Sequence, residues 1–474
     1  MKRLIWRNRQ NRKSNILNII LYFSLITGLF VVGFLYLNFT KKQEFIQKYL
    51  GNVITLTPGV GNTKTGTISD PECEWLEDSP YADSVNAIIL SEKYLVNARA
   101  IGQDESYEAE KEKIQNIFER EFIGEYKKEY HANCHVIGLQ DSELSPYFLN
   151  RGYKLIKGKA LTQNDGGKKE VLISEKLAEE NDLHIGDTIK IHTDAMEIAS
   201  YGSGAEREVD FVIKGIYQYE GGKSKAQGCK YQYENGIFVP GETLKEVYAS
   251  EFCHYVQIIL KDYSYKEKLM SEMTRTFGEQ QYEFHTNDQW NKIIQKPIQG
   301  MERVSGGIYL VLLIGILIIL CILTAYHVRK GKKEIGILLA MGEKKSRLIR
   351  EYIIQEIGCV LLGGVLAFLL TVCIIAPIAQ NVNARQEQEV QQEVQEEYKK
   401  RQERYMEHSK VTVFDEYSRP ELGNVLIQQK TEYTVPITEM FILFTGVILV
   451  LLTVLIIQIS ILLSGENIKQ KFLK

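Results

Sequence analysis

The chain has 474 residues, with 57 Lys and Arg against 60 Asp and Glu and a formal net charge of −3. This length exceeds what one hydrophobic core normally supports, so we expect two or three folding units. The charges are nearly balanced and the basic residues gather beside apolar segments, which excludes a protein with a strongly basic nucleic-acid-binding face.

Four apolar runs stand apart from this average composition. Each has roughly 20 residues or more, which at 1.5 Å per residue is enough to cross a ~30 Å hydrocarbon core. A buried core helix is the alternative for any single run, but four runs with basic flanks favour membrane spans. The first run is too long for a cleavable signal peptide, and no small-residue cleavage site follows it before Lys41. We therefore predict four transmembrane helices, at residues 16–38, 304–327, 353–379 and 437–464.

The basic residues define an orientation for these helices. Six Lys and Arg precede the first span (residues 1–15), eight lie between the second and third (328–352), and three follow the last (465–474). By the positive-inside rule these segments are cytoplasmic, and both chain termini with them. Residues 39–303 and 380–436 then face outward from a cell membrane that the chain crosses four times.

The first outward segment, residues 39–303, has the pattern of a mixed α/β extracytoplasmic domain. Short apolar or alternating stretches predict strands, and they are densest in a β-rich middle subdomain at about 134–240. A charged helix is predicted at Glu105–Tyr130, and a shorter helix begins after Ser174, which is placed to cap it. The predicted strands are NVITLTPG, VNAIILSEKYLVNARAIG, CHVIGL, KEVLIS, DTIKIHT, DFVIKGIYQ, NGIFVP, HYVQIILK and YEFHT.

An even number of cysteines falls in this outward segment, in a compartment that permits disulfides: Cys73, Cys134, Cys229 and Cys253. Three connectivities are possible. We favour Cys73–Cys134 and Cys229–Cys253 because these pairs close the shorter loops within separate regions, with free thiols as the alternative. The remaining cysteines lie in predicted spans, where small buried thiols are ordinary.

Two short motifs in the outward segment resemble binding sites. EGGKS (Glu220–Ser224) is similar to a phosphate-binding loop, but Tyr217 stands where the first Gly is needed, so a surface turn is the better account. HANCH brings His131, Cys134 and His135 close together, yet the spacing matches no established zinc pattern. Without a hydrolase or metalloprotease motif, we expect no catalytic residues, metal or cofactor.

The cytoplasmic loop and the start of the third span read KEIGILLAMGEKKSRLIREYIIQE. Ile335, Leu338 and Leu339 fall on one helical face with lysines at both ends, so the loop is suited to dock in a groove on a partner protein. An amphipathic turn lying on anionic lipid is the alternative. The candidate contact residues are Lys333, Glu334, Ile335, Gly336, Leu338, Leu339, Met341 and Gly342.

The third span carries a carboxylate and a pair of small residues. Glu356 lies about four residues into the span, and we favour a place at interface depth beside Arg347 and Arg350 over a functional role inside the membrane. Gly363 and Gly364 allow close approach of another helix, so this span is expected to pack against a neighbour.

The second outward segment, residues 380–436, contains a helix-forming stretch at about 385–410 with only a thin apolar stripe. We favour a solvated helical extension of the third span packed against the larger domain. A coiled-coil or partner-docking surface is the alternative.

The layout of one span, a large outer domain and three further spans resembles the MacB/FtsX-type permeases of ABC transporters. The loop residues Lys333-Glu334-Ile335-Gly336, Ala340, Gly342 and Ile349 match the motif of that family, as does Glu356 followed by Gly363-Gly364. The ordered strand segments of the outer domain are similar to its MacB-like extracytoplasmic domain. Unlike MacB itself, this chain has no fused nucleotide-binding domain, and its second outward loop is longer than expected.

The resemblance implies a non-catalytic permease subunit that works by mechanotransmission. ATP would be bound and hydrolysed by a separate ABC ATPase dimer, and the spans would carry the motion of that dimer to the outer domain. The implied task is export or extraction of a peptide, lipopeptide or lipoprotein. The alternative is a non-transporting signal transmitter that activates an extracellular partner such as a cell-wall hydrolase. Expected partners are the lipid bilayer, a second permease chain (identical or different) and an extracytoplasmic adaptor or hydrolase.

Overall fold

The computed structural model describes residues 9–59, 67–121, 126–150, 152–220, 228–248, 252–278, 281–330, 341, 344–406 and short stretches between 438 and 457. The chain divides into two compact units. We name them the helical unit (Met1–Gln43, Gln295–Glu389 and Thr431–Lys474) and the sheet unit (Glu44–Ile294 and Val390–Lys430).

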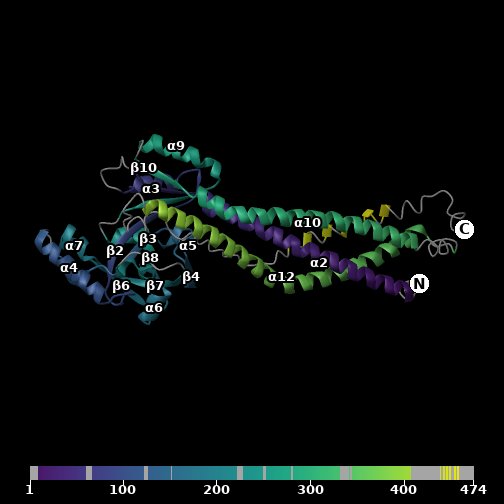
Figure 1. Cartoon of the computed structure of the whole chain (residues 1–474), viewed down its shortest axis with the longest axis horizontal. Helices are drawn as coiled ribbons and strands as arrows, with labels where there is room; N and C mark the ends of the chain where they lie inside the picture. The colour runs from purple at the N-terminus through teal and green to yellow at the C-terminus, as the bar shows by residue number, and fades with distance from the viewer. Residues whose placement is uncertain are drawn as a thin grey trace. The chain divides into compact units, whose positions relative to one another are not determined.

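The helical unit contains long stretches of three helices, α2 (Arg9–Ile46), α10 (Asp288–Lys330) and α12 (Lys345–Met406) (Figure 1). Three segments among the described residues are long and apolar enough to cross a membrane: Ile16–Gly51, Ile294–Ile319 and Ile357–Val382. They overlap the first three predicted spans, with different bounds. The predicted span at 437–464 lies almost wholly outside the described residues, so the fourth crossing stays a prediction.

Helices α2 and α10 pack through a reciprocal arrangement of tyrosines and glycines. The rings of Tyr36 and Tyr309 are stacked, with centroids 6.1 Å apart and an interplanar angle of 11°. A Cβ added at Gly306 would lie 3.0 Å from the Tyr36 ring, and one at Gly33 would lie 3.0 Å from the Tyr309 ring. Each ring therefore occupies space that only a glycine on the opposite helix leaves open.

Helix α12 contacts α2 at the glycine pair noted in the sequence. A Cβ added at Gly363 would lie 3.1 Å from the backbone oxygen of Ile19 and 3.1 Å from Cβ of Tyr22. The helix then continues to Met406, so residues 380–406 extend the helix of the third span, as the sequence predicts.

The described strands of the sheet unit form one sheet in the order β10-β1-β9-β2-β3-β8-β5-β7-β4, with β6 paired to β2 and β7. Most pairs are antiparallel, while β3–β8 and β5–β7 are parallel. The strands are β1 (Val53–Pro58), β2 (Ala82–Leu95), β3 (Cys134–Leu139), β4 (Tyr153–Gly158), β5 (Glu170–Ser174), β6 (Thr188–Thr193), β7 (Glu208–Tyr219), β8 (Gly236–Pro240), β9 (Tyr255–Leu260) and β10 (Tyr282–Thr286).

Strand β2 joins the two halves of this sheet. It pairs with β9 along Ala82–Ile88 and with β3 along Ile89–Lys93. The β-rich middle predicted at about 134–240 is therefore not a separate sheet. Its strands continue the sheet that β1, β9 and β10 begin, because β2 is long enough to pair in both halves.

Short helices lie beside the strands of this sheet (Figure 1). With the sheet they enclose apolar cores. Helices α3 and α9 contribute Leu76 and Met273 to a core shared with β1 and β9, while α6 and α8 contribute Leu177 and Leu244 to a second core. Helix α5 supplies aromatic residues to a third. The helices are α3 (Asp70–Glu77), α4 (Glu105–Glu121), α5 (Pro146–Asn150), α6 (Glu175–Glu180), α7 (Ala195–Tyr201), α8 (Gly241–Val247) and α9 (Lys266–Phe277).

Local sequence signals agree with much of this fold and differ at defined places. The Ser174 side chain accepts a hydrogen bond from the Leu177 N–H at 3.0 Å, which confirms the predicted cap of α6. The helix predicted at Glu105–Tyr130 is too long, because α4 ends at Glu121 and residues 128–130 form a 3₁₀ turn. That turn leads to His131, whose carbonyl accepts a 2.5 Å hydrogen bond from the buried Tyr107 hydroxyl, so tertiary contacts override the helical pattern there.

Candidate functional site

The predicted partner-contact loop lies largely outside the described residues. This holds for Lys333, Glu334, Ile335, Gly336, Leu338, Leu339 and Gly342. Met341 is described and is 65 % exposed in a turn. Glu356 lies within α12, where its side chain is not among those described, while Gly363 and Gly364 are buried in the same helix. The docking role of the loop therefore stays a prediction.

The four outward cysteines are buried thiols, and the structure groups them in pairs other than those favoured from sequence. Cys73 shares an apolar core with Cys253, whereas Cys134 shares a different core with Cys229. The favoured pairs Cys73–Cys134 and Cys229–Cys253 are thus divided between two cores. Sheet topology, and not loop length, sets which cysteines share a core.

The first candidate site is the junction where α2 leads into the sheet and the sheet leads into α10. After α2, residues Gln47–Gly51 form a π-helical turn and β1 follows at once. Strand β10 leads into α10 in the same way, and β10 pairs antiparallel with β1 through the register Ile54↔Thr286. The two connections are therefore neighbours on adjacent strands, and single π turns of this kind recur at functional sites.

Amide side chains tie the two sides of this junction together. The Gln47 side-chain amide donates to Asn52 Oδ1 at 3.0 Å, and the Asn291 side-chain amide donates to Gln47 Oε1 at 3.3 Å. A Cβ added at Gly51 would lie 2.6 Å from Nδ2 of Asn291 and 2.6 Å from Nε2 of Gln47. The turn after α2 is thus held against the first turn of α10, and Gly51 leaves room for the two side-chain amides where they meet.

Asp288 anchors the start of α10. Its carboxylate accepts hydrogen bonds from the Tyr263 hydroxyl at 2.9 Å, from Lys266 Nζ at 3.1 Å and from the Thr286 hydroxyl at 3.0 Å. Burial alone would raise the pKa of Asp288, but these donors outweigh it and the pKa is lowered. A carboxylate that stays ionised suits the first turn of a helix, where the dipole favours negative charge.

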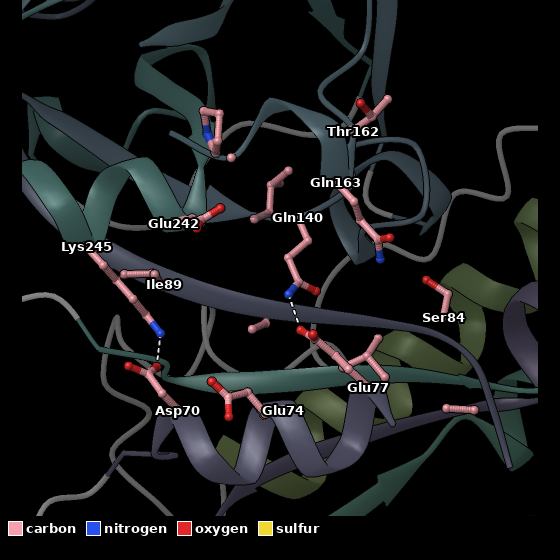
Figure 2. A pocket seen from close by; sticks show the side chains of 18 of the residues that line it. Asp70, Glu74, Glu77, Ser84, Ile89, Gln140, Thr162, Gln163, Glu242 and Lys245 are labelled. Carbon is pink, nitrogen blue, oxygen red and sulfur yellow. Dashed lines mark hydrogen bonds and ion pairs between the residues drawn. The ribbon is translucent and has the colours of Figure 1, made fainter. Parts of the chain in front are cut away.

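The second candidate site is a cavity of about 650 Å³ in the sheet unit, which we name the cleft. Its walls come from α3, the first half of β2, the 162–166 turn and the start of α8 (Figure 2). The cavity volume lies in the range that small ligands or a few peptide side chains occupy.

The lining of this cleft is strongly acidic, with five carboxylates and a single lysine: Asp70, Glu74, Glu77, Asp83, Glu242 and Lys245. Three of the acids stand on α3 at positions i, i+4 and i+7, so they share one helix face. Figure 2 shows this row of side chains along the helix. The spacing was the one signal in the sequence that could have indicated the site, and it was missed because a short helix before β2 was not predicted.

Two contacts cross the cleft. Lys245 of α8 forms an ion pair with Asp70, and the Gln140 side-chain amide donates to Glu77 (Figure 2). Burial alone would lower the pKa of Lys245, but the hydrogen bond and charge of Asp70 raise it. The remaining carboxylates keep the cleft negative, which favours cationic over anionic groups by simple Coulomb attraction.

The junction and the cleft are connected through one ion pair. Lys48 in the π turn lies 2.8 Å from Asp83, which lines the cleft from β2. Residues of the HANCH motif lie elsewhere: burial lowers the pKa of both His131 and His135 to about 4. Among the described residues, no three His, Cys, Asp or Glu side chains are grouped to hold a metal ion.

Residues 15–276 match the family model described as the MacB-like periplasmic core domain. A curated relative, "Uncharacterized ABC transporter permease YclI" of Bacillus subtilis (strain 168), is 26 % identical over 230 residues, which are 47 % of this chain and 46 % of that protein. The chain thus spans about half the length of the curated relative it matches.

Two solved structures are also similar. The periplasmic region of MacB from Actinobacillus actinomycetemcomitans aligns at 13 % identity and a TM-score of 0.33, over 53 % of this chain and 96 % of its own. The extracellular domain of the noncanonic ABC-type transporter YknZ from Gram-positive bacteria aligns at 12 % identity and a TM-score of 0.30, over 50 % and 100 %.

The family match covers the first apolar helix and most of the sheet unit, which together are more than half of the 474 residues. Apolar helices of spanning length accompany it. This chain is a membrane protein with an extracytoplasmic domain, and it belongs to the MacB-like periplasmic core domain family.

Proposed function

We propose that this chain is the permease subunit of an ABC transporter of the MacB/FtsX mechanotransmission type. It couples ATP hydrolysis by a separate ATPase to movement of its extracytoplasmic sheet unit, for export or extraction of a peptide, lipopeptide or lipoprotein. Family membership and the naming of the Bacillus relative as an ABC transporter permease support this assignment.

The observation that carries the proposal is the junction. Helix α2 feeds β1, β10 feeds α10, and β1 and β10 are paired strands. The amide contacts of Gln47 with Asn52 and Asn291 hold the two connections together. Any displacement of one helix relative to the other is therefore applied directly to two hydrogen-bonded strands. Packed elements with discrete arrangements transmit such displacement rather than absorbing it.

The cytoplasmic loop at 328–352 receives the motion in this proposal. Its apolar face and basic ends dock on the ATPase, which binds ATP, while the chain termini lie on the same cytoplasmic side. Two permease chains, identical or different, meet in the membrane to match an ATPase dimer.

The coupling step is tested by co-expressing the full chain with an ABC ATPase encoded beside it and isolating the complex in detergent. Glu334→Arg and Gly342→Pro should abolish co-purification and permease-stimulated ATPase activity. Lys469→Glu in the C-terminal tail is the charge-changing control and should leave both at the wild-type level. Undiminished binding and stimulation in the two loop variants would refute the docking role.

Photo-crosslinking from the cleft tests which kind of cargo the protein handles. A photo-crosslinking residue replacing Ser84, which lines the cleft, should capture a peptide, lipopeptide or lipoprotein in an ATP-dependent manner in cells. The same residue replacing Ser271, exposed on α9, is the control and should capture none of these. Capture of a cell-wall hydrolase at Ser84 would instead favour the signal-transmitting alternative.

A further inference from the structure

Cys73 and Cys253 meet although they are far apart in the sequence. Cys73 lies in α3, while Cys253 lies just before β9, and the two residues are 6 % and 0 % exposed in the same apolar core. The Ile68 N–H donates to the Cys253 carbonyl at 2.9 Å, which fixes the segment leading into α3 against the segment leading into β9. The two thiols interact directly, and their hydrogen bond is the largest cause that raises the pKa of Cys253.

Cys134 and Cys229 form a second group in the other core. Cys134 is the first residue of β3, and Cys229 begins a short turn that the Asn235 side chain holds by donating to the Cys229 carbonyl at 2.7 Å. The Cys229 thiol contacts the carbonyl of Asn133, the residue next to Cys134, at 3.5 Å. Both thiols are buried in this core, at 0 % and 4 % exposure.

We propose that the extracytoplasmic domain carries two disulfides, Cys73–Cys253 and Cys134–Cys229. Disulfides join residues whose Cα atoms lie about 4.4–6.8 Å apart, which restricts pairing to cysteines in one core. The other two connectivities each require bonds between the α3/β9 core and the β3 core. Cell-exterior domains are exposed to oxidising conditions in which such bonds form and persist.

Each bond forms by thiol–disulfide exchange. Two protein thiols give up two protons and two electrons to an external disulfide, for example that of an envelope dithiol oxidase or of oxidised glutathione, which is released as two thiols. Burial is the largest cause that raises the pKa of Cys229, to about 12, and it raises the pKa of Cys134 as well. Since the thiolate is the reacting form, the Cys134–Cys229 bond forms before its core closes, and afterwards its sulfurs are shielded from reductant.

The first bond has a consequence for the cleft. Cys73 lines it together with Asp70, Glu74 and Glu77 of α3. A Cys73–Cys253 bond would attach this acidic wall covalently to the start of β9, so that α3 moves with the sheet. The inference rests on the extracytoplasmic location of the domain and not on the transport function.

The test uses the full chain purified in detergent from membranes. Denaturation in excess N-ethylmaleimide without reductant, followed by peptide mass mapping, should find three alkylated cysteines of the seven and cross-linked peptides 73–253 and 134–229. With reductant, all seven should be alkylated. Four further alkylated thiols without reductant, or either of the other connectivities, would overturn the proposal.

Single substitutions provide an independent reading. Cys73→Ala should liberate one new alkylatable thiol, at Cys253, and leave the 134–229 peptide intact; Cys134→Ala should do the converse. Cys373→Ala in α12, where the residue is exposed, is the control and should remove one alkylated site without freeing another. If a variant fails to accumulate, the wild-type peptide map alone decides, and a liberated thiol at any other cysteine contradicts the assigned pairs.

Discussion

Lys48 and Asp83 form an ion pair, with 2.8 Å between Nζ and Oδ2, that connects the junction to the acidic cleft. Lys48 stands in the π turn after α2, and Asp83 lines the cleft from β2. The two side chains are 46 % and 39 % exposed, so solvent screens their attraction and the pair adds little to stability. Its importance is positional, because it holds the turn that follows a membrane helix against a wall of the cleft.

Reversing the charge of Lys48 should weaken transmission without unfolding the protein. For Lys48→Glu we expect the free energy of unfolding to change by less than ~1 kcal/mol, as for other exposed pairs. The ATP-dependent change in maleimide labelling of a Ser84→Cys reporter should fall several-fold in the assembled complex, because the turn no longer holds Asp83.

The charge swap Lys48→Glu with Asp83→Lys restores the attraction and should restore the labelling change. Lys154→Glu reverses an exposed lysine of β4 that is paired at 3.7 Å with Glu220, the residue after β7, and it should behave as wild type. A wild-type response in Lys48→Glu, or no recovery in the swap, contradicts this connection.

Replacing Gly51 should disturb the amide cluster of the junction. In Gly51→Ala the new Cβ would lie 2.6 Å from the side-chain nitrogens of Gln47 and Asn291, so their hydrogen bond must break or shift. Because both nitrogens end flexible side chains that can move aside, we expect a loss of stability of about 0.5–1.5 kcal/mol, that of one hydrogen bond, seen as a lower melting temperature of the detergent-purified chain.

The control for this change is Gly28→Ala in α2, where an added Cβ meets nothing within 4 Å. Because alanine is a better helix former than glycine, this variant should be neutral or slightly stabilised. Equal melting temperatures for Gly51→Ala and wild type would mean that the cluster does not hold the two connections together.

Neighbouring glycines of α10 offer a matched test of the α2–α10 contact. Gly306→Leu would drive a side chain into the Tyr36 ring, which already lies 3.0 Å from the position of a Cβ. We expect about 1–3 kcal/mol of destabilisation by overpacking. Gly307→Leu places the same side chain where nothing lies within 4 Å, and it should leave the melting temperature near that of wild type. Similar losses in both variants would show that the effect is not specific to this contact.

Asp194 should make stability depend on pH. Burial, followed by the charge of Glu92, raises the pKa of Asp194 to about 6, and its Oδ1 atom has no hydrogen-bond partner among the described residues. The backbone of Met196 and the charges of Lys93 and Lys230 oppose this shift. A carboxyl whose folded pKa is raised contributes stability that is present below the unfolded pKa, near 3.9, and is lost as pH rises through about 6.

We therefore expect Asp194→Asn to raise the free energy of unfolding at pH 8 by on the order of 1–3 kcal/mol, since an amide of the same size carries no buried charge. The gain should shrink between pH 6 and pH 4 in thermal unfolding curves, as the wild-type carboxyl becomes protonated. Asp78→Asn, at an exposed position, is the control and should show no such trend. A gain that does not vary with pH would exclude titration of Asp194 as its cause.

The sequence by itself determined the features that depend on a few neighbouring residues. The first three spans follow from runs of apolar residues, and strands such as β3 and β9 follow from short apolar stretches. The cap at Ser174 follows from a hydroxyl placed three residues before Leu177, whose N–H donates a hydrogen bond to it. Only the tertiary structure decided that β1 lies beside β10, that Cys73 meets Cys253, and that the acids of α3 face a cavity. These relationships join segments that are distant in the chain. Burial and hydrogen bonding across the whole sheet determine which strands pair. The local periodicity of a strand predicts the strand but not its neighbour.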